Sequence, residues 1–144
     1  MPKEQPDHHD ADLILKLYDL RREAVMRRSR DALNARFWPK TYDDFLAVTR
    51  PDHPLNTAFR QVSSYWEMAY SLARHGIVSA DFLVENNAEG LFLHAKVEPF
   101  LERFRREVNP LAFRNSEWVT KQCDEGRRRY EIIQARVRKM LETK

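Results

Sequence analysis

The chain has 144 residues, of which 42% are hydrophobic and 33% are charged, and its formal net charge is +3. A chain of this length can form one domain that buries roughly two thirds of its unfolded surface without disulfides or metals. Three glycines are too few for the many turns of a β protein, and a single cysteine excludes an internal disulfide. We therefore expect one all-α domain in a reducing, cytoplasmic compartment.

The start of the chain carries two prolines and no apolar periodicity. We expect residues 1–9 to be a flexible lead-in and residues 10–144 to be the single helical domain. The start is polar and acidic, unlike a secretory signal, and no apolar run approaches the roughly 20 residues that a membrane-spanning helix needs. We therefore expect neither secretion nor a membrane span.

The first helical pattern begins at Asp10, which we expect to cap a helix that reaches about Arg28. Beyond that point apolar residues become rarer, so the helix either continues or breaks before the next element. Thr41 and Asp44 then form a capping box, with Asp in place of the usual Glu. They open a short helix that Pro51 ends.

The most apolar helix is predicted over residues 55–76. Six residues recur along it at spacings of four and three: Leu55, Phe59, Val62, Trp66, Ala69 and Ala73. Asn56 or Thr57 is expected to cap its start, and Gly76 suits a left-handed residue after its last turn. Because its other face carries small serines and few charges, we expect neighbouring helices to surround it almost completely.

Ser79 is predicted to cap a further helix that ends near Gly90. Residues 91–108 also have a helical pattern, but Pro99 lies inside it. Proline removes a backbone hydrogen bond and clashes with the preceding turn, so we expect a kink or a new helix start near residues 97–99.

The last helix is predicted to begin near Asn115 or Ser116 and to run almost to the end of the chain. An apolar seam follows it at four-three spacing: Val119, Cys123, Gly126, Tyr130, Ile133, Val137 and Met140. The seam either docks on the rest of the bundle, which we favour, or pairs with a second copy as a homodimer. The whole pattern predicts a bundle of five to six helices with a long C-terminal helix.

Three segments resemble an uncharacterised family of bacterial all-helical proteins, a domain of unknown function. They are HHDADLILKLYDLRREAVMRRSRD, FRQVSSYWEMAYSLARHG and AKVEPFLERFR, in that order. The resemblance implies a helical fold, and it brings no activity, cofactor or catalytic residue. Some relatives have an N-terminal membrane segment, which we do not expect in this chain.

The usual signatures of catalysis and cofactor binding are absent from the sequence. It contains no glycine-rich phosphate loop, CxxC pair, HExxH or GxSxG motif. We therefore expect no cofactor. Four neighbouring residues could still hold a divalent metal, since imidazole and carboxylate are common ligands: His8, His9, Asp10 and Asp12. A solvated, acidic first turn explains the same residues more simply.

Four further residues are weak catalytic candidates. Glu67 lies midway along the most apolar helix, where burial would raise the pKa of its carboxyl and suit it to acid–base chemistry. His75 is a candidate companion near the end of the same helix. His94 and Glu98 lie one helical turn apart and could act as an acid–base pair. A hydrogen-bonded structural pair is the simpler interpretation of His94 and Glu98. For Glu67 the simpler interpretation is a narrow polar stripe that faces water (Ser63, Glu67, Ser71 and Arg74), and for His75 it is a cap of helix-end carbonyls.

Arginines cluster in the first, fifth and last predicted helices. Clusters that converged on one face would form a phosphate-binding surface. Many of these arginines have an acidic residue at salt-bridging distance along the helix, as Glu102 and Arg106 do. The leading hypothesis is thus a noncatalytic structural or protein-interaction domain, self-associating or not. The alternatives are a nucleic-acid-binding protein and, third, an enzyme with an internal Glu/His site.

Overall fold

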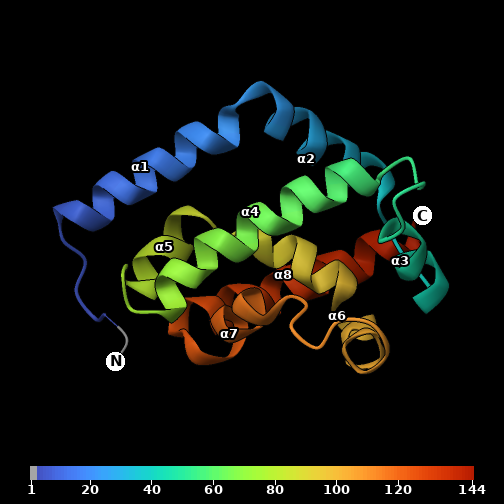
Figure 1. The fold of residues 1–144 in the computed structure, drawn as a ribbon. Coiled ribbons are helices and arrows are strands. Elements are labelled where there is room, and N and C mark those ends of the chain that lie inside the picture. Colours follow the sequence, from blue (N-terminus) through green and yellow to red (C-terminus); the bar gives the residue numbers. More distant parts are fainter. Residues whose placement is uncertain (1–2) are drawn as a thin grey trace.

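The computed structural model describes residues 3–144, which form eight α-helices and no strand (Figure 1). The helices are α1 (His8–Arg22), α2 (Ala24–Arg36), α3 (Tyr42–Val48), α4 (Asn56–Arg74), α5 (Ala80–Asn86), α6 (Glu89–Glu107), α7 (Arg114–Gln122) and α8 (Asp124–Glu142). The all-α prediction is confirmed, but five to six helices is wrong. The difference arises because two of the predicted helices are each divided by a sharp turn.

The first division is at Glu23, whose backbone is extended (ψ 144°) between α1 and α2. The Glu23 carboxylate accepts hydrogen bonds from the N–H groups of Val25 and Met26, at 3.0 and 3.1 Å. It therefore acts as an N-cap, and these bonds also hold the pKa of its carboxyl below the usual value. Because Glu23 lies within a continuous helical pattern, the sequence does not indicate this break.

The second division is at Cys123, so the single long C-terminal helix of the sequence prediction is wrong. Cys123 is extended, and its Sγ accepts a hydrogen bond from the N–H of Gly126. Asp81 of α5 binds the same corner, because its Oδ1 accepts from the Cys123 thiol and from the N–H of Glu125. A carboxylate on another helix thus fixes the point where α8 begins.

Other helix boundaries follow the sequence prediction in part. The capping box of Thr41 and the Ser79 cap are both present. Asp7 caps α1 in place of Asp10, and α1 begins at His8, inside the expected lead-in. Residues 1–2 of that lead-in lie outside the described residues. Helix α6 continues through Pro99 without a new start.

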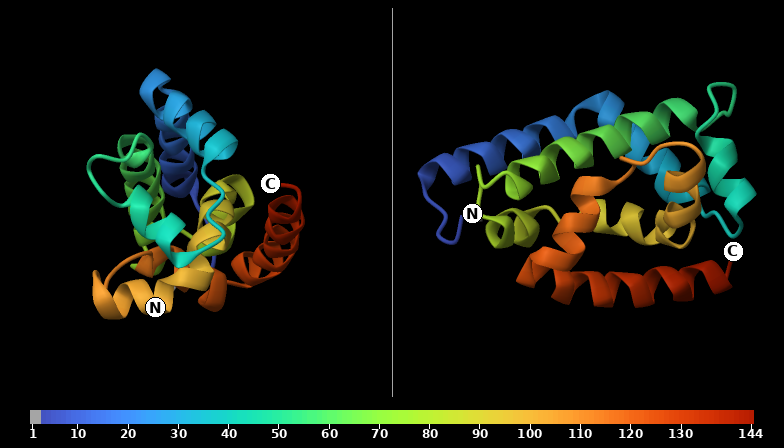
Figure 2. Two further views of the ribbon diagram at one scale, coloured as in Figure 1. Left: turned by 90° about the vertical axis from the view of Figure 1, so that its right-hand side faces the viewer. Right: turned by 60° about the horizontal axis from the view of Figure 1, so that its bottom comes forward.

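Helix α6 is the most enclosed helix of the bundle. Its residues from Gly90 to Val97 are all buried except for Phe92, and Figure 2 shows it lying between α4 and α8. Helix α4 packs on α2 along one side and on α7 along another. Arg60 and Ser64 of α4 are exposed. The prediction that neighbours surround α4 almost completely is therefore wrong, because one of its faces stays open to solvent.

Helices α4 and α6 meet at Gly90, the second residue of α6. A Cβ atom there would lie 2.6 Å from the ring and hydroxyl of Tyr70 and 2.8 Å from the ring of Trp66. Tyr70 is fully buried and donates a hydrogen bond to the carbonyl of Asn87 at 2.8 Å. Only glycine permits this close approach, which brings α6 directly against α4.

Candidate functional site

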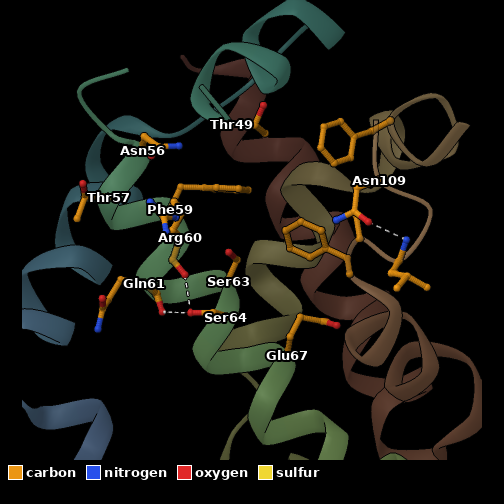
Figure 3. Close-up of a pocket in the computed structure, with 14 residues that line it drawn as sticks. Thr49, Asn56, Thr57, Phe59, Arg60, Gln61, Ser63, Ser64, Glu67 and Asn109 are labelled. Carbon is orange, nitrogen blue, oxygen red and sulfur yellow. Dashed lines mark hydrogen bonds between the residues drawn. The ribbon is translucent and has the colours of Figure 1, made fainter. Parts of the chain in front are cut away.

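The open face of α4 forms one side of a surface groove of about 720 Å³ (Figure 3). The other sides come from the end of α3, the C-terminal half of α6 and the loop between α6 and α7. The lining residues are Thr49, Asn56, Thr57, Phe59, Arg60, Gln61, Ser63, Ser64, Glu67, Phe104, Asn109, Leu111, Ala112 and Phe113. Hereafter "the groove" means this set of residues.

The floor of the groove is apolar and the loop beside it is exposed. Phe59, Phe104 and Phe113 are largely buried, and the ring centroids of Phe59 and Phe113 lie 6.1 Å apart. Leu111 at the rim is 62% exposed. Phe113 has a left-handed backbone (φ 56°), which costs a non-glycine residue roughly 1–2 kcal/mol. The surrounding contacts sustain this conformation, which turns the loop into α7.

The α4 wall of the groove carries polar side chains with spare hydrogen-bonding capacity. Ser64 donates to the carbonyls of Arg60 and Gln61, as Figure 3 shows. The side chains of Thr57, Gln61 and Ser63 make no hydrogen bond to any described residue, and Arg60 makes no ion pair with one. These groups can bond to a ligand without losing a partner in the protein.

Glu67, at one end of the groove, binds the start of α7 with both of its carboxylate oxygens. Its Oε2 accepts from the N–H of Asn115 and its Oε1 from the N–H of Ser116, both at 2.9 Å. The Asn115 amide also donates to the Glu67 carbonyl at 3.1 Å. These amides belong to the first turn of α7, so Glu67 caps α7 from another helix and complements its dipole.

His94 lies behind the same turn of α7. It is 1% exposed, and its Nδ1 shares a 2.7 Å hydrogen bond with the hydroxyl of Ser116. Burial lowers the pKa of its imidazole to about 4. Glu98 instead accepts from the Tyr130 hydroxyl at 2.7 Å and from Gln134 at 2.6 Å. The structure therefore places no direct hydrogen bond between His94 and Glu98.

The remaining sequence candidates are dispersed. His75 is exposed at the C-terminal end of α4, and its ring makes no hydrogen bond to a described residue. His8 and His9 are exposed, with ring centroids 4.5 Å apart. Asp12 is also exposed, whereas Asp10 is fully buried.

Asp10 points into the bundle and contributes to its structure. Its carboxylate accepts from the N–H of Ser79 at 3.0 Å and from the Lys3 ammonium at 2.7 Å. It is therefore committed to α5 rather than to the neighbouring histidines. Among residues 3–144, no three His, Cys, Asp or Glu side chains gather closely enough to hold a metal ion.

The predicted C-terminal seam lies within the bundle. Val119, Cys123, Tyr130 and Val137 are buried, and Ile133 and Met140 are partly buried. Helix α8 packs along α6, with α5 and α7 covering its start. A homodimer through this seam would require α8 to separate from α6.

Eight of the eighteen arginines form ion pairs with nearby acids among the described residues. The pairs include Arg21 and Arg30 with Glu89, Arg103 with Glu107, Arg105 with Glu117, Arg106 with Glu102, Arg127 with Asp124, and Arg128 and Arg129 with Glu125. Each of these carboxylates neutralises the positive charge of its arginine, which would otherwise attract a phosphate. The paired arginines are therefore poor candidates for phosphate binding, whereas the other arginines of the same clusters make no ion pair with a described residue.

Sequence reasoning missed one residue of chemical interest, Lys96. It is 2% exposed, and its ammonium lies 4.0 Å from the centre of the Trp38 ring. Burial lowers the pKa of its amine to about 7. Its spacing of three from Leu93 and four from Phe100 places it on the apolar stripe of α6. A lysine on an otherwise apolar stripe is the sequence signal that could have revealed this residue.

The fold and the groove define the class of the protein: an all-α bundle with one open face on its fourth helix. The family described as "Domain of unknown function (DUF4760)" matches residues 6–123, and the chain belongs to this family. Neither a curated protein nor a solved structure matches the chain. In the described part of the chain, no helix has both the length and the apolar character that crossing a membrane needs.

Proposed function

We propose that this domain is a noncatalytic protein-interaction module that binds a short segment of a partner protein in the groove. The groove itself is the observation that carries the proposal. Its volume of about 720 Å³ lies in the range that ligand sites in proteins occupy. It also combines an apolar floor with polar groups that have no partner among the described residues, as interaction sites do.

The charges of the groove define the chemistry of its occupant. Arg60 is its one cation and Glu67 its one anion, and both oxygens of Glu67 are already bound by amides of α7. A partner segment would place an apolar side chain on the phenylalanine floor and a carboxylate against Arg60. Ser63 and Gln61 would bond to its backbone.

The same contacts favour binding over catalysis. An acid–base residue needs a lone pair or proton directed at the substrate. The Glu67 carboxylate is directed at two backbone amides instead, and His75 makes no hydrogen bond to it. The candidate acid–base pair of the sequence is therefore not assembled beside the groove.

The test is selection of peptides from a random display library on the folded domain, followed by affinity measurements on variants. Ser63→Trp fills the groove, and Arg60→Glu reverses its charge. Each is expected to weaken selected peptides by at least about tenfold. The selected sequences are expected to combine an apolar residue with Asp or Glu.

Two controls make the same chemical changes outside the groove. Ser71→Trp lies further along α4, and Arg50→Glu lies in an exposed turn after α3. Both are expected to bind selected peptides like the unmodified domain. Peptides that bind Ser63→Trp and Arg60→Glu with full affinity would overturn the proposal.

A further inference from the structure

Lys96 places a charged group in the interior of the bundle without an acidic partner. Its ammonium donates to the carbonyl of Leu33 at 3.2 Å, and it makes no ion pair with a described residue. A lysine ammonium has three N–H donors, so this single bond leaves two without a protein acceptor. Burial disfavours an unpaired charge, which lowers the pKa of this amine to about 7.

Aromatic rings offset part of this cost. The Lys96 Nζ lies 4.0 Å from the ring centroid of Trp38, 5.1 Å from that of Phe92 and 5.8 Å from that of Phe37. Such rings attract a cation through their faces. They accept no conventional hydrogen bond, so the two remaining N–H donors still need an acceptor oxygen.

A pocket of about 420 Å³ adjoins Lys96 at the surface, and we name it the lysine pocket. Its lining comes from the segment after α2, the middle of α6 and the end of α8: Pro39, Lys40, Lys96, Pro99, Phe100, Leu141 and Glu142. Most of its wall is apolar. Its charged groups are two lysines and one glutamate, so its balance is cationic.

The second lysine is held in position at the pocket. Lys40 donates to a main-chain oxygen of Lys144, which keeps its ammonium beside the end of α8. Lys144 also places its ammonium 4.9 Å from the ring centroid of Trp38. The Lys96 and Lys144 ammonium groups thus both lie close to the Trp38 ring, where like charges repel unless an anion lies among them.

We propose that the lysine pocket binds a small organic anion with an apolar body. A carboxylate or phosphate head would accept hydrogen bonds from the Lys96 and Lys40 ammonium groups, and a hydrocarbon chain would lie on Pro39, Pro99, Phe100 and Leu141. Charge-assisted hydrogen bonds of this kind are stronger than neutral ones. This site is separate from the groove and independent of the function proposed for it.

The test measures binding of short amphiphiles to the full chain by titration calorimetry. Octanoate and octyl phosphate distinguish a carboxylate head from a phosphate head, octanol lacks the charge, and acetate lacks the apolar body. One of the two octyl anions is expected to bind at least about tenfold more tightly than octanol and acetate. Equal affinity for octanol and both anions would overturn the proposal, as would no binding of either anion at millimolar concentration.

Variants then locate the site. Lys96→Met keeps an unbranched side chain, one atom shorter, and removes its charge, and it is expected to weaken binding of the anion by at least about tenfold. The matched control is Lys121→Met, an exposed lysine paired with Glu117 on α7. Full affinity in Lys96→Met, or an equal loss in Lys121→Met, would contradict the assignment.

The tryptophan indole signals give a readout that does not depend on a variant. Trp38 donates its indole N–H to the carbonyl of Asn34 at 2.9 Å, beside the Lys96 ammonium. In an NMR titration with the tighter octyl anion, the Trp38 indole signal is expected to shift and that of Trp118 on α7 to stay in place. A shift of Trp118 alone would place the anion elsewhere and overturn the proposal.

Discussion

Glu67 on α4 holds the first turn of α7 through a 2.9 Å hydrogen bond from the N–H of Ser116 to its Oε1. Helix α7 has nine residues, and isolated helices of that length are unstable in water. Its N-cap residue, Phe113, has no side chain that can cap it. A carboxylate on a different helix therefore supplies the acceptor that the local sequence lacks.

Glu67→Ala is expected to lower the free energy of unfolding by about 1–3 kcal/mol, because two backbone amides lose a charged acceptor. Glu67→Gln is expected to lower it less, since an amide oxygen still accepts. Urea unfolding followed by circular dichroism measures both. Glu131→Ala, at an exposed position on α8, is the control and is expected to change little. Equal losses in Glu67→Ala and the control would refute the capping role.

Lys96→Met is expected to stabilise the ligand-free domain at pH 7 and below by about 1–3 kcal/mol, because it replaces a buried unpaired charge. Burial lowers the pKa of Lys96 from 10.5 to about 7, so the unfolded state binds more protons between these values. Stability of the unmodified chain therefore rises with pH across that interval. The advantage of Lys96→Met should shrink as pH rises from 7 to 10.5. An advantage that stays constant in unfolding curves would contradict this.

Buried His94 is expected to lower the stability of the fold at acidic pH. Burial lowers the pKa of its imidazole from 6.5 to about 4, so the unfolded state binds more protons between these values. The unmodified chain should therefore lose stability relative to His94→Gln as pH falls from 6.5 to 4. Ser116→Ala keeps the buried imidazole and should retain the same loss. Parallel stability curves for the unmodified chain and His94→Gln would exclude this role of His94.

The position of the C-terminal seam predicts a monomer. Sedimentation equilibrium of the full chain is expected to give the monomer mass of 17.2 kDa, since the seam packs against α6. Val137 is 2% exposed and Ile132 is 58% exposed on the same helix. Val137→Asp should destabilise the fold by more than about 3 kcal/mol, whereas Ile132→Asp should change it little. A dimer that Ile132→Asp dissociates would show that the outer face of α8 pairs instead.

Periodicity was sufficient to predict the fold class and most apolar positions. Phe59, Val62 and Trp66 are buried as the four-three spacing requires, and the Thr41 capping box opens α3. These features depend on interactions within one turn or one helix face. They are therefore local properties of the sequence.

The helix breaks and the role of Glu67 depend on partners far along the chain. The corner at Cys123 is bound by Asp81, 42 residues earlier, and Glu67 binds amides 48 and 49 residues later. No spacing rule reports such pairs. The groove is equally non-local, because the loop that closes it returns to α4 from the end of α6. A carboxylate on an apolar helix signals both a catalytic acid and a cap for another helix.

Three carboxylates accept a backbone N–H at the start of another helix, and they share a direction along the chain. Asp10 binds the N–H of Ser79, Glu67 the start of α7, and Asp81 the N–H of Glu125. In each case the acceptor precedes the amide in the sequence. Since a ribosome synthesises the chain from its N-terminus, each acceptor residue is already present when the residue with its amide emerges. The domain can therefore secure each of these junctions as the later residues are synthesised.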